Sequence, residues 1–101
     1  MSYKLISKSE QDLEDIYEYT YLNWGELQAD KYLSELNKAF DVLSAFPNLG
    51  KKFNHTINVF TSPYKSNNIV YLVHLKEIVI LRLLHYRQDL EVKLSNVPCE
   101  I

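Results

Sequence analysis

The residues best suited to chemistry lie together near the end of the chain, in the segment Arg82-Leu83-Leu84-His85-Tyr86-Arg87. This segment holds both arginines of the chain, together with a histidine and a tyrosine. An arginine guanidinium can clamp a carboxylate or phosphate through two parallel hydrogen bonds, and a histidine can transfer protons near neutral pH. Taken singly, each has a stronger structural interpretation, because Arg82 can stack on Tyr71 across a sheet and His85 can sit hydrogen-bonded at a core edge.

Residue counts exclude or disfavour most other kinds of site. With Gly25 and Gly50 as its only two glycines, the chain has no glycine-rich loop to cradle a phosphate. The three histidines are far apart in sequence with no cysteine beside them, so neither a metal nor a cofactor is expected. The single cysteine, Cys99, excludes a disulfide framework, and without a nearby base it is not expected to act as a nucleophile.

The net charge of −2 conceals an asymmetry between the two halves of the chain. Residues 1–50 carry four lysines against nine carboxylates, whereas residues 51–101 carry seven Lys or Arg against four carboxylates. Loop lysines 51, 52 and 65, with Arg87, give only a weak basic face. Nucleic-acid affinity comes mostly from phosphate neutralisation, so no specific DNA binding by the chain alone is expected. The simplest explanation of the acidic half is that its helices expose a solvated, charged face.

The first half of the chain predicts a strand followed by two helices. A short, partly alternating segment, Tyr3–Ser7, is typical of a strand, and the Ser7–Glu10 spacing matches a capping box, with Ser9 as a competing cap. Glycine 25 separates two segments of helical periodicity that must fold back on each other, and Pro47 ends the second. The two apolar stripes consist of Leu13, Ile16, Tyr17, Thr20, Tyr21 and Trp24, then Ala29, Tyr32, Leu33, Leu36, Phe40 and Leu43.

The second half predicts strands. Alternation over residues 57–61 indicates one strand limited by Pro63, and residues 68–75 and 78–85 read as an antiparallel hairpin. A two-residue turn at Lys76-Glu77 would pair Leu75 with Ile78, although Lys-Glu suits such a turn poorly and a longer loop is the alternative. Ile69, Tyr71, Ile80, Arg82 and Leu84 would then share one face with Ile78. Both faces are largely apolar, so each must be covered or bind a partner.

These elements predict a single α+β domain over residues 1–101, with a helical hairpin packed on a small antiparallel sheet in the order β-α-α-β-β-β. Residues 87–94 can add a short closing helix, and residues 95–101 are expected to form a flexible tail. No apolar run resembles a signal peptide or a membrane span, which favours the cytoplasm and argues against a membrane partner. A hydrophobic fraction of 47% excludes intrinsic disorder.

Tyrosines 17, 19 and 21 lie too close together on one helix for all to point inward. We therefore expect Tyr19 to face outward or to an edge, where exposed tyrosine favours a protein interface. A single exposed aromatic residue is also ordinary on protein surfaces.

The combined pattern of these residues resembles the ParE branch of the RelE/ParE toxin superfamily over residues 3 to about 90. The most specific parts of the resemblance are Trp24-Gly25 with Gln28-Ala29, Pro47 with Leu49-Gly50, and Arg82, His85 and Arg87 on the last strand. The resemblance implies the fold order given above and a type II toxin–antitoxin module. It also implies a ParD-like antitoxin as obligate partner, with which an oligomeric complex is expected, and DNA gyrase as the leading target.

On this basis we assign target binding or toxicity to Arg82, His85, Arg87 and Lys65. Antitoxin contact is assigned to Tyr19, Trp24, Tyr32 and Tyr71.

Two alternatives remain open. In the first, the chain is a RelE-like, ribosome-dependent mRNA endoribonuclease that uses Arg82, His85, Tyr86 and Arg87, with Arg87 stabilising charge on the scissile phosphate. The net acidic charge disfavours this alternative, as does Glu91-Val92-Lys93, which stands where the nuclease branch carries a tyrosine. In the second, the chain is a degenerate toxin that only binds its antitoxin.

Overall fold

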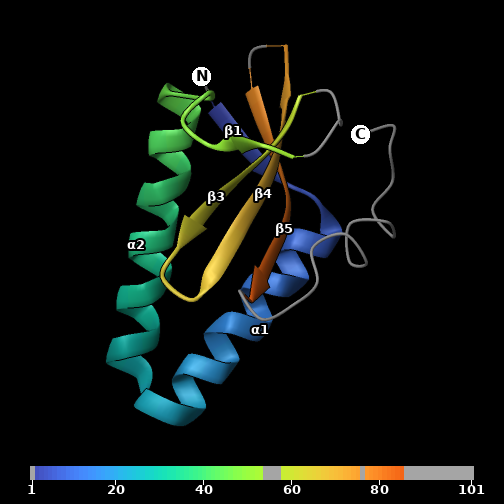
Figure 1. The fold of residues 1–101 in the computed structure, drawn as a ribbon. Coiled ribbons are helices and arrows are strands. Elements are labelled where there is room, and N and C mark those ends of the chain that lie inside the picture. Colours follow the sequence, from blue (N-terminus) through green and yellow to red (C-terminus); the bar gives the residue numbers. More distant parts are fainter. Residues whose placement is uncertain (1, 54–57, 76, 86–101) are drawn as a thin grey trace.

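The computed structural model describes residues 2–53, 58–75 and 77–85. Two helices pack beside a five-stranded sheet (Figure 1). The elements are β1 (Ser2–Leu5), α1 (Ser7–Trp24), α2 (Glu26–Ala45), β2 (Lys51–Lys52), β3 (Val59–Tyr64), β4 (Asn67–His74) and β5 (Glu77–His85). The predicted α+β class is confirmed, with the two-residue strand β2 as an addition. Site candidates Tyr86 and Arg87, the closing helix over 87–94, and the tail with Cys99 lie outside the described residues.

The helical hairpin forms around Gly25, as the sequence predicts. Gly25 adopts a φ of 91°, and its N–H donates to the carbonyl of Tyr21 while its own carbonyl accepts from Ala29, so one residue closes α1 and opens α2. The predicted Ser7–Glu10 capping box is wrong, because α1 begins at Ser7 with Ile6 as its N-cap. Ser9, the competing candidate, is not the N-cap either: it is the third residue of the helix, and its side chain bonds back to Ile6. The hydroxyl of Ser9 accepts from the Ile6 N–H at 2.9 Å and donates to the Ile6 carbonyl at 3.0 Å.

The strands lie in the order β1-β5-β4-β3-β2. Strand β1 runs parallel to β5, and the other three pairs are antiparallel. The prediction that Pro63 limits its strand is wrong, because β3 continues through Pro63 to Tyr64. Strand β2 pairs only with Phe60 and Thr61, so Pro63 lies on the uncovered edge of β3, where its missing N–H removes no ladder hydrogen bond.

The register of the β4–β5 hairpin differs from the expected one. Ile78 pairs with Val73 rather than Leu75, which lies in the turn with a φ of 53°. The pairing shifts again farther along, where Tyr71 pairs with Ile80 but Val70 pairs with Arg82. This bulge inserts an extra residue into β5 and exchanges the faces of the residues that follow it.

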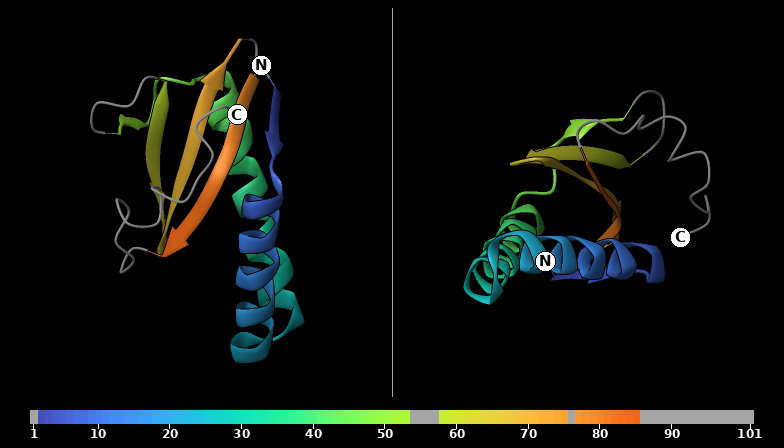
Figure 2. Two further views of the ribbon diagram at one scale, coloured as in Figure 1. Left: turned by 90° about the vertical axis from the view of Figure 1, so that its right-hand side faces the viewer. Right: turned by 90° about the horizontal axis from the view of Figure 1, so that it is seen from below.

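Both faces of the sheet are apolar, as predicted, and each carries a cluster of buried side chains. The two helices cover one face (Figure 2). The core on that side consists of Leu36, Phe40, Leu43, Ile69, Tyr71, Ile78, Ile80 and Leu83. A second cluster consists of Val59, Val70, Val79, Leu81 and Leu84, with Ile6, Phe53 and Leu72 packed against it. Because of the bulge, Leu83 rather than Leu84 belongs to the helix-facing core. Full burial of each such side chain contributes about 1.5–3 kcal/mol.

The length and hydropathy of the helices also bear on membrane association. Within the described part of the chain, neither helix combines the length and apolar character needed to cross a bilayer.

Candidate partner-binding groove

A groove of about 680 Å³ lies where the hairpin meets the lower end of the sheet. Its volume falls in the range typical of small-molecule sites. Its walls come from α1, from α2, from the turn between β3 and β4, and from the last residues of β5. The lining residues are Asp12, Asp15, Ile16, Tyr19, Thr20, Trp24, Gln28, Tyr32, Lys65, Ser66, Asn67, Leu83 and His85.

This groove brings together five residues that the sequence marked for function. Tyr19, Trp24 and Tyr32 were expected to contact an antitoxin, and Lys65 and His85 were expected to contact a target. They come from three parts of the chain and meet because the β3–β4 turn folds down beside the hairpin. Members of both predicted sets therefore share one surface, although Arg82 and Tyr71 do not line the groove.

The hairpin supplies the aromatic wall of the groove. The rings of Tyr19 and Trp24 meet edge to face with centroids 5.8 Å apart, and both side chains are more than half exposed. Trp24 and Tyr21 belong to the apolar stripe predicted for the first helix, but both side chains are exposed. The hairpin continues past the ends of the strands (Figure 1), so its corner has no sheet to pack against.

The opposite wall is held by an interaction cluster around Lys65. Its ammonium lies 2.8 Å from the carboxylate of Glu35, and it stands 5.3 Å and 5.7 Å from the ring centroids of Tyr32 and Tyr64. The hydroxyl of Tyr64 donates to the same Glu35 oxygen at 3.1 Å, and the amide of Asn67 donates to the Tyr32 hydroxyl at 2.7 Å. These contacts tie the turn to α2 and fix the orientation of Tyr32.

The electrostatics of this cluster follow from its hydrogen bonds. The bond from Lys65 lowers the pKa of Glu35, and the bond to Glu35 raises the pKa of Lys65. Burial raises the pKa of Tyr64, and its bond to Glu35 raises it further. Lys65 also holds a backbone φ of 52°, a conformation that favours glycine. A lysine kept in this conformation places its side chain beside Tyr32.

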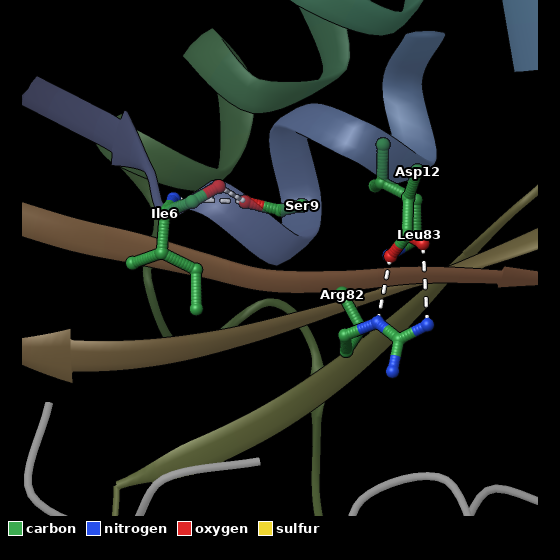
Figure 3. Close-up of polar contacts among 5 residues, drawn as sticks. All are labelled: Ile6, Ser9, Asp12, Arg82 and Leu83. Atoms are coloured by element: carbon green, nitrogen blue, oxygen red, sulfur yellow. Dashed lines mark hydrogen bonds and ion pairs between the residues drawn. The ribbon is translucent and has the colours of Figure 1, made fainter. Parts of the chain in front are cut away.

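Arg82 forms an ion pair with Asp12 on α1. Its Nε donates to Asp12 Oδ2 at 2.7 Å and a terminal nitrogen donates to Oδ1 at 3.2 Å (Figure 3). The backbone N–H of Leu83 donates to the same carboxylate at 2.9 Å. Arg82 therefore pairs with Asp12 instead of stacking on Tyr71, whose ring stacks on Phe60 with centroids 5.6 Å apart.

Tyr71 is fully buried, although the sequence analysis assigned it to antitoxin contact. Its hydroxyl donates to the Pro47 carbonyl at 2.7 Å and accepts from the Gly50 N–H at 3.0 Å, which holds the loop after α2 against the sheet. Burial raises the pKa of this phenol. Since Tyr71 presents no surface, the antitoxin assignment is kept for Tyr19, Trp24 and Tyr32 alone.

Sequence reasoning missed Asp12 and Asp15 as groove residues. Their signal was helical spacing, because Asp12 precedes Ile16 by four positions and Tyr19 by seven, and these separations place all three on one helix face. Asn67 and Ser66 had no local signal, since only the turn geometry brings them to the groove. Over residues 2–53, 58–75 and 77–85, no three His, Cys, Asp or Glu side chains gather as a metal site would require.

Comparison with known proteins identifies the family. Residues 3–90 match the family described as the ParE toxin of the type II toxin–antitoxin system parDE. The chain belongs to the ParE toxin family. Toxin ParE1 of Mycobacterium tuberculosis, found in two strains, is 30% identical to it over 91 residues, which is 88% of this chain and 93% of that protein.

Other ParE relatives agree over similar lengths. Toxin ParE1 of Caulobacter vibrioides is 24% identical over 93 residues, covering 92% of this chain and 97% of the relative. A solved chain of the chromosomal ParDE TA system from P. aeruginosa superposes with a TM-score of 0.72 and 26% identity, covering 84% of this chain and 95% of that chain. This ParE-family chain therefore matches its relatives over nearly their whole length.

Proposed function

We propose that this ParE-family toxin arrests bacterial growth by binding DNA gyrase in the cytoplasm, and that a cognate small antitoxin neutralises it by occupying the groove. The observation that carries the proposal is the match of the ParE toxin family to residues 3–90. The toxin acts by binding a protein target, not by chemistry of its own.

The groove supports the antitoxin part of this proposal. Large, rigid aromatic side chains dominate the energetics of protein interfaces, and the groove offers Tyr19, Trp24 and Tyr32 on its surface. A flexible antitoxin tail that folds on binding can cover such a surface despite the entropy cost of ordering.

Net charge favours gyrase binding over mRNA cleavage. A ribosome-dependent nuclease grips RNA phosphates with many basic residues, whereas this chain has a net charge of −2. Arg82 does not separate the two functions, because it is a candidate for both and its guanidinium is paired with Asp12. His85 lines the same groove as Tyr19 and Trp24, which supports a role in contact with a protein partner.

Two parallel assays test the target. The purified toxin is added to a gyrase supercoiling reaction and to a ribosome-programmed mRNA cleavage reaction, each with and without the purified small protein encoded beside its gene. We expect loss of supercoiling, restored by the small protein, and intact mRNA. A heat-denatured toxin sample is the control for nonspecific inhibition.

The other outcomes separate the alternatives. Cleavage of mRNA with normal supercoiling would overturn the gyrase proposal in favour of the endoribonuclease. Inactivity in both assays, with no growth arrest on induction but with a stable complex, would identify a degenerate toxin that only binds its antitoxin.

A further inference from the structure

We propose that the corner of the helical hairpin is the docking surface for a basic amphipathic segment of the antitoxin, with apolar residues and Lys or Arg on adjoining faces. This inference rests on the proposed function, because it assigns the segment to the antitoxin. It adds the chemistry that the segment must have. We call this surface the hairpin tip and define it by Tyr19, Leu22, Trp24 and Leu27 with the neighbouring acids Asp15, Glu18 and Glu26.

The apolar part of the hairpin tip is unusually exposed. Tyr19, Leu22, Trp24 and Leu27 have exposed fractions of 61%, 73%, 63% and 88%. They lie within nine consecutive residues around one helical corner, and two of them meet ring to ring. Neighbouring large apolar side chains that stay exposed on a small domain mark an interaction site.

The hairpin tip is continuous with the groove, because Tyr19 and Trp24 belong to both. An extended or helical segment lying in the groove would therefore leave it across the tip. The helix spacing of Asp15, Tyr19 and Leu22 gives this path a carboxylate flank beside its apolar centre.

The charge around the tip is mostly negative, and the nearest cation along the sequence is Lys31, four positions after Leu27. Residues 9–30 contain seven Asp or Glu and no Lys or Arg. One of the seven, Asp12, is neutralised by Arg82 from the sheet, and Asp30 accepts a hydrogen bond from Tyr17 on the hairpin. Glu18 lies one turn before Leu22, and Glu26 lies between Trp24 and Leu27. The apolar side chains are therefore bordered by exposed carboxylates.

This combination selects one class of occupant. A second copy of the chain would place carboxylates against carboxylates, and like charges facing each other across an interface disfavour association. Nucleic acid and anionic lipid surfaces carry negative charge and would be repelled for the same reason. A polypeptide with apolar anchors and flanking Lys or Arg satisfies both parts of the surface, in the manner of a helix laid in a groove.

The test uses the full chain and the small protein encoded beside its gene, with affinity measured by calorimetry at two salt concentrations. The tip variant combines Glu18→Lys with Glu26→Lys. The matched control combines Glu10→Lys with Asp41→Lys, because Glu10 and Glu26 each lie in the first turn of their helix, and Glu18 and Asp41 are exposed farther along. Circular dichroism melting of each variant checks that it folds.

We expect the tip variant to bind at least about tenfold more weakly with a reduced salt dependence, and the control to stay within about threefold of the original chain. Trp24→Ala should weaken binding by about tenfold or more, as truncation of an interface anchor does. An unchanged dissociation constant in the folded tip variant would overturn the inference while leaving the antitoxin proposal intact.

A peptide arm keeps the result independent of the proposed function. The probes are two labelled amphipathic peptides of equal length, one built from Leu and Lys and the other from Leu and Glu. If the neighbouring small protein does not bind, the antitoxin proposal fails. Saturable binding of the lysine peptide, lost in the tip variant, then still supports a docking surface for basic segments. Equal binding of both peptides, or of neither, would overturn it.

Sedimentation tests the remaining occupant, a second copy of the chain. A dimer that forms in the original chain and not in Trp24→Ala would identify a second copy as the occupant and would also overturn the inference.

Discussion

Asp12 on α1 and Arg82 on β5 form a two-point ion pair across 70 positions of sequence, with both side chains about one-seventh exposed. The same carboxylate accepts the Leu83 backbone N–H. The pair sits at the bulge of β5, directly before the groove residues Leu83 and His85. It therefore fastens α1 to the strand end that the groove uses.

Removing the carboxylate should destabilise the fold. Asp12→Ala leaves the Arg82 charge and the Leu83 N–H without their partner, and we expect the free energy of unfolding to fall by about 2–4 kcal/mol. Urea denaturation measures the change, with the exposed neighbour Asp15→Ala as control. The double variant Asp12→Ala/Arg82→Ala should cost less than the sum of the single variants. A loss below about 0.5 kcal/mol in Asp12→Ala would show that the pair contributes nothing.

Removing the buried hydroxyl of Tyr71 should also destabilise the fold. Tyr71→Phe keeps the ring that stacks on Phe60 but leaves the Gly50 N–H and the Pro47 carbonyl unpaired. We expect a loss of about 1–3 kcal/mol in chemical denaturation. Tyr19→Phe, which removes an exposed hydroxyl, should change stability by less than about 0.5 kcal/mol. Equal stability of the two variants would refute the structural role given to Tyr71.

The Glu35–Lys65 pair should make stability depend on pH. Because the pKa of Glu35 is lowered in the folded state from its ordinary value of 4.5, its stabilisation is present above that value and is lost as the pH falls through the folded pKa. Lys65, with its pKa raised from 10.5, stabilises below that value and loses the effect as the pH rises through the folded pKa.

The corresponding experiment compares the original chain with Glu35→Gln by urea denaturation at several pH values. We expect Glu35→Gln to be less stable at pH 6–7, and the difference to shrink steadily below about pH 4 as the carboxylate protonates. A difference that stays constant from pH 7 to pH 3 would show that the charge of Glu35 is not the cause.

Substituting Arg87 should affect toxicity but not antitoxin binding. From the family resemblance we expect Arg87→Ala to abolish growth arrest on induction while leaving antitoxin affinity nearly unchanged, because Arg87 is assigned to the target. Growth curves and calorimetry measure the two properties. Lys93→Ala, another loss of one positive charge near the end of the chain, is the control and should remain toxic. Full toxicity of Arg87→Ala would show that the target-binding residues were misassigned.

The sequence alone determined the elements that depend on local periodicity. Apolar spacing of three and four predicted both helices, Gly25 predicted the corner between them, and the β-branched and aromatic residues after residue 67 predicted the final hairpin. These features were predictable because side-chain period and backbone preference act over a few neighbouring residues. Part of the site followed as well, since Tyr19 had to face outward from a helix with one buried side.

How these elements meet depends on long-range packing. The bulge that sends Leu83 and Leu84 to opposite faces depends on how β4 and β5 pack between two apolar layers, and no local pattern encodes it. The burial of Tyr71 depends on the loop at Gly50, and the exposure of Trp24 depends on where the sheet ends. The groove joins Tyr19 to Lys65 because long-range packing folds a turn of the sheet beside a helix, and contacts between distant segments are set by the whole core rather than by neighbouring residues.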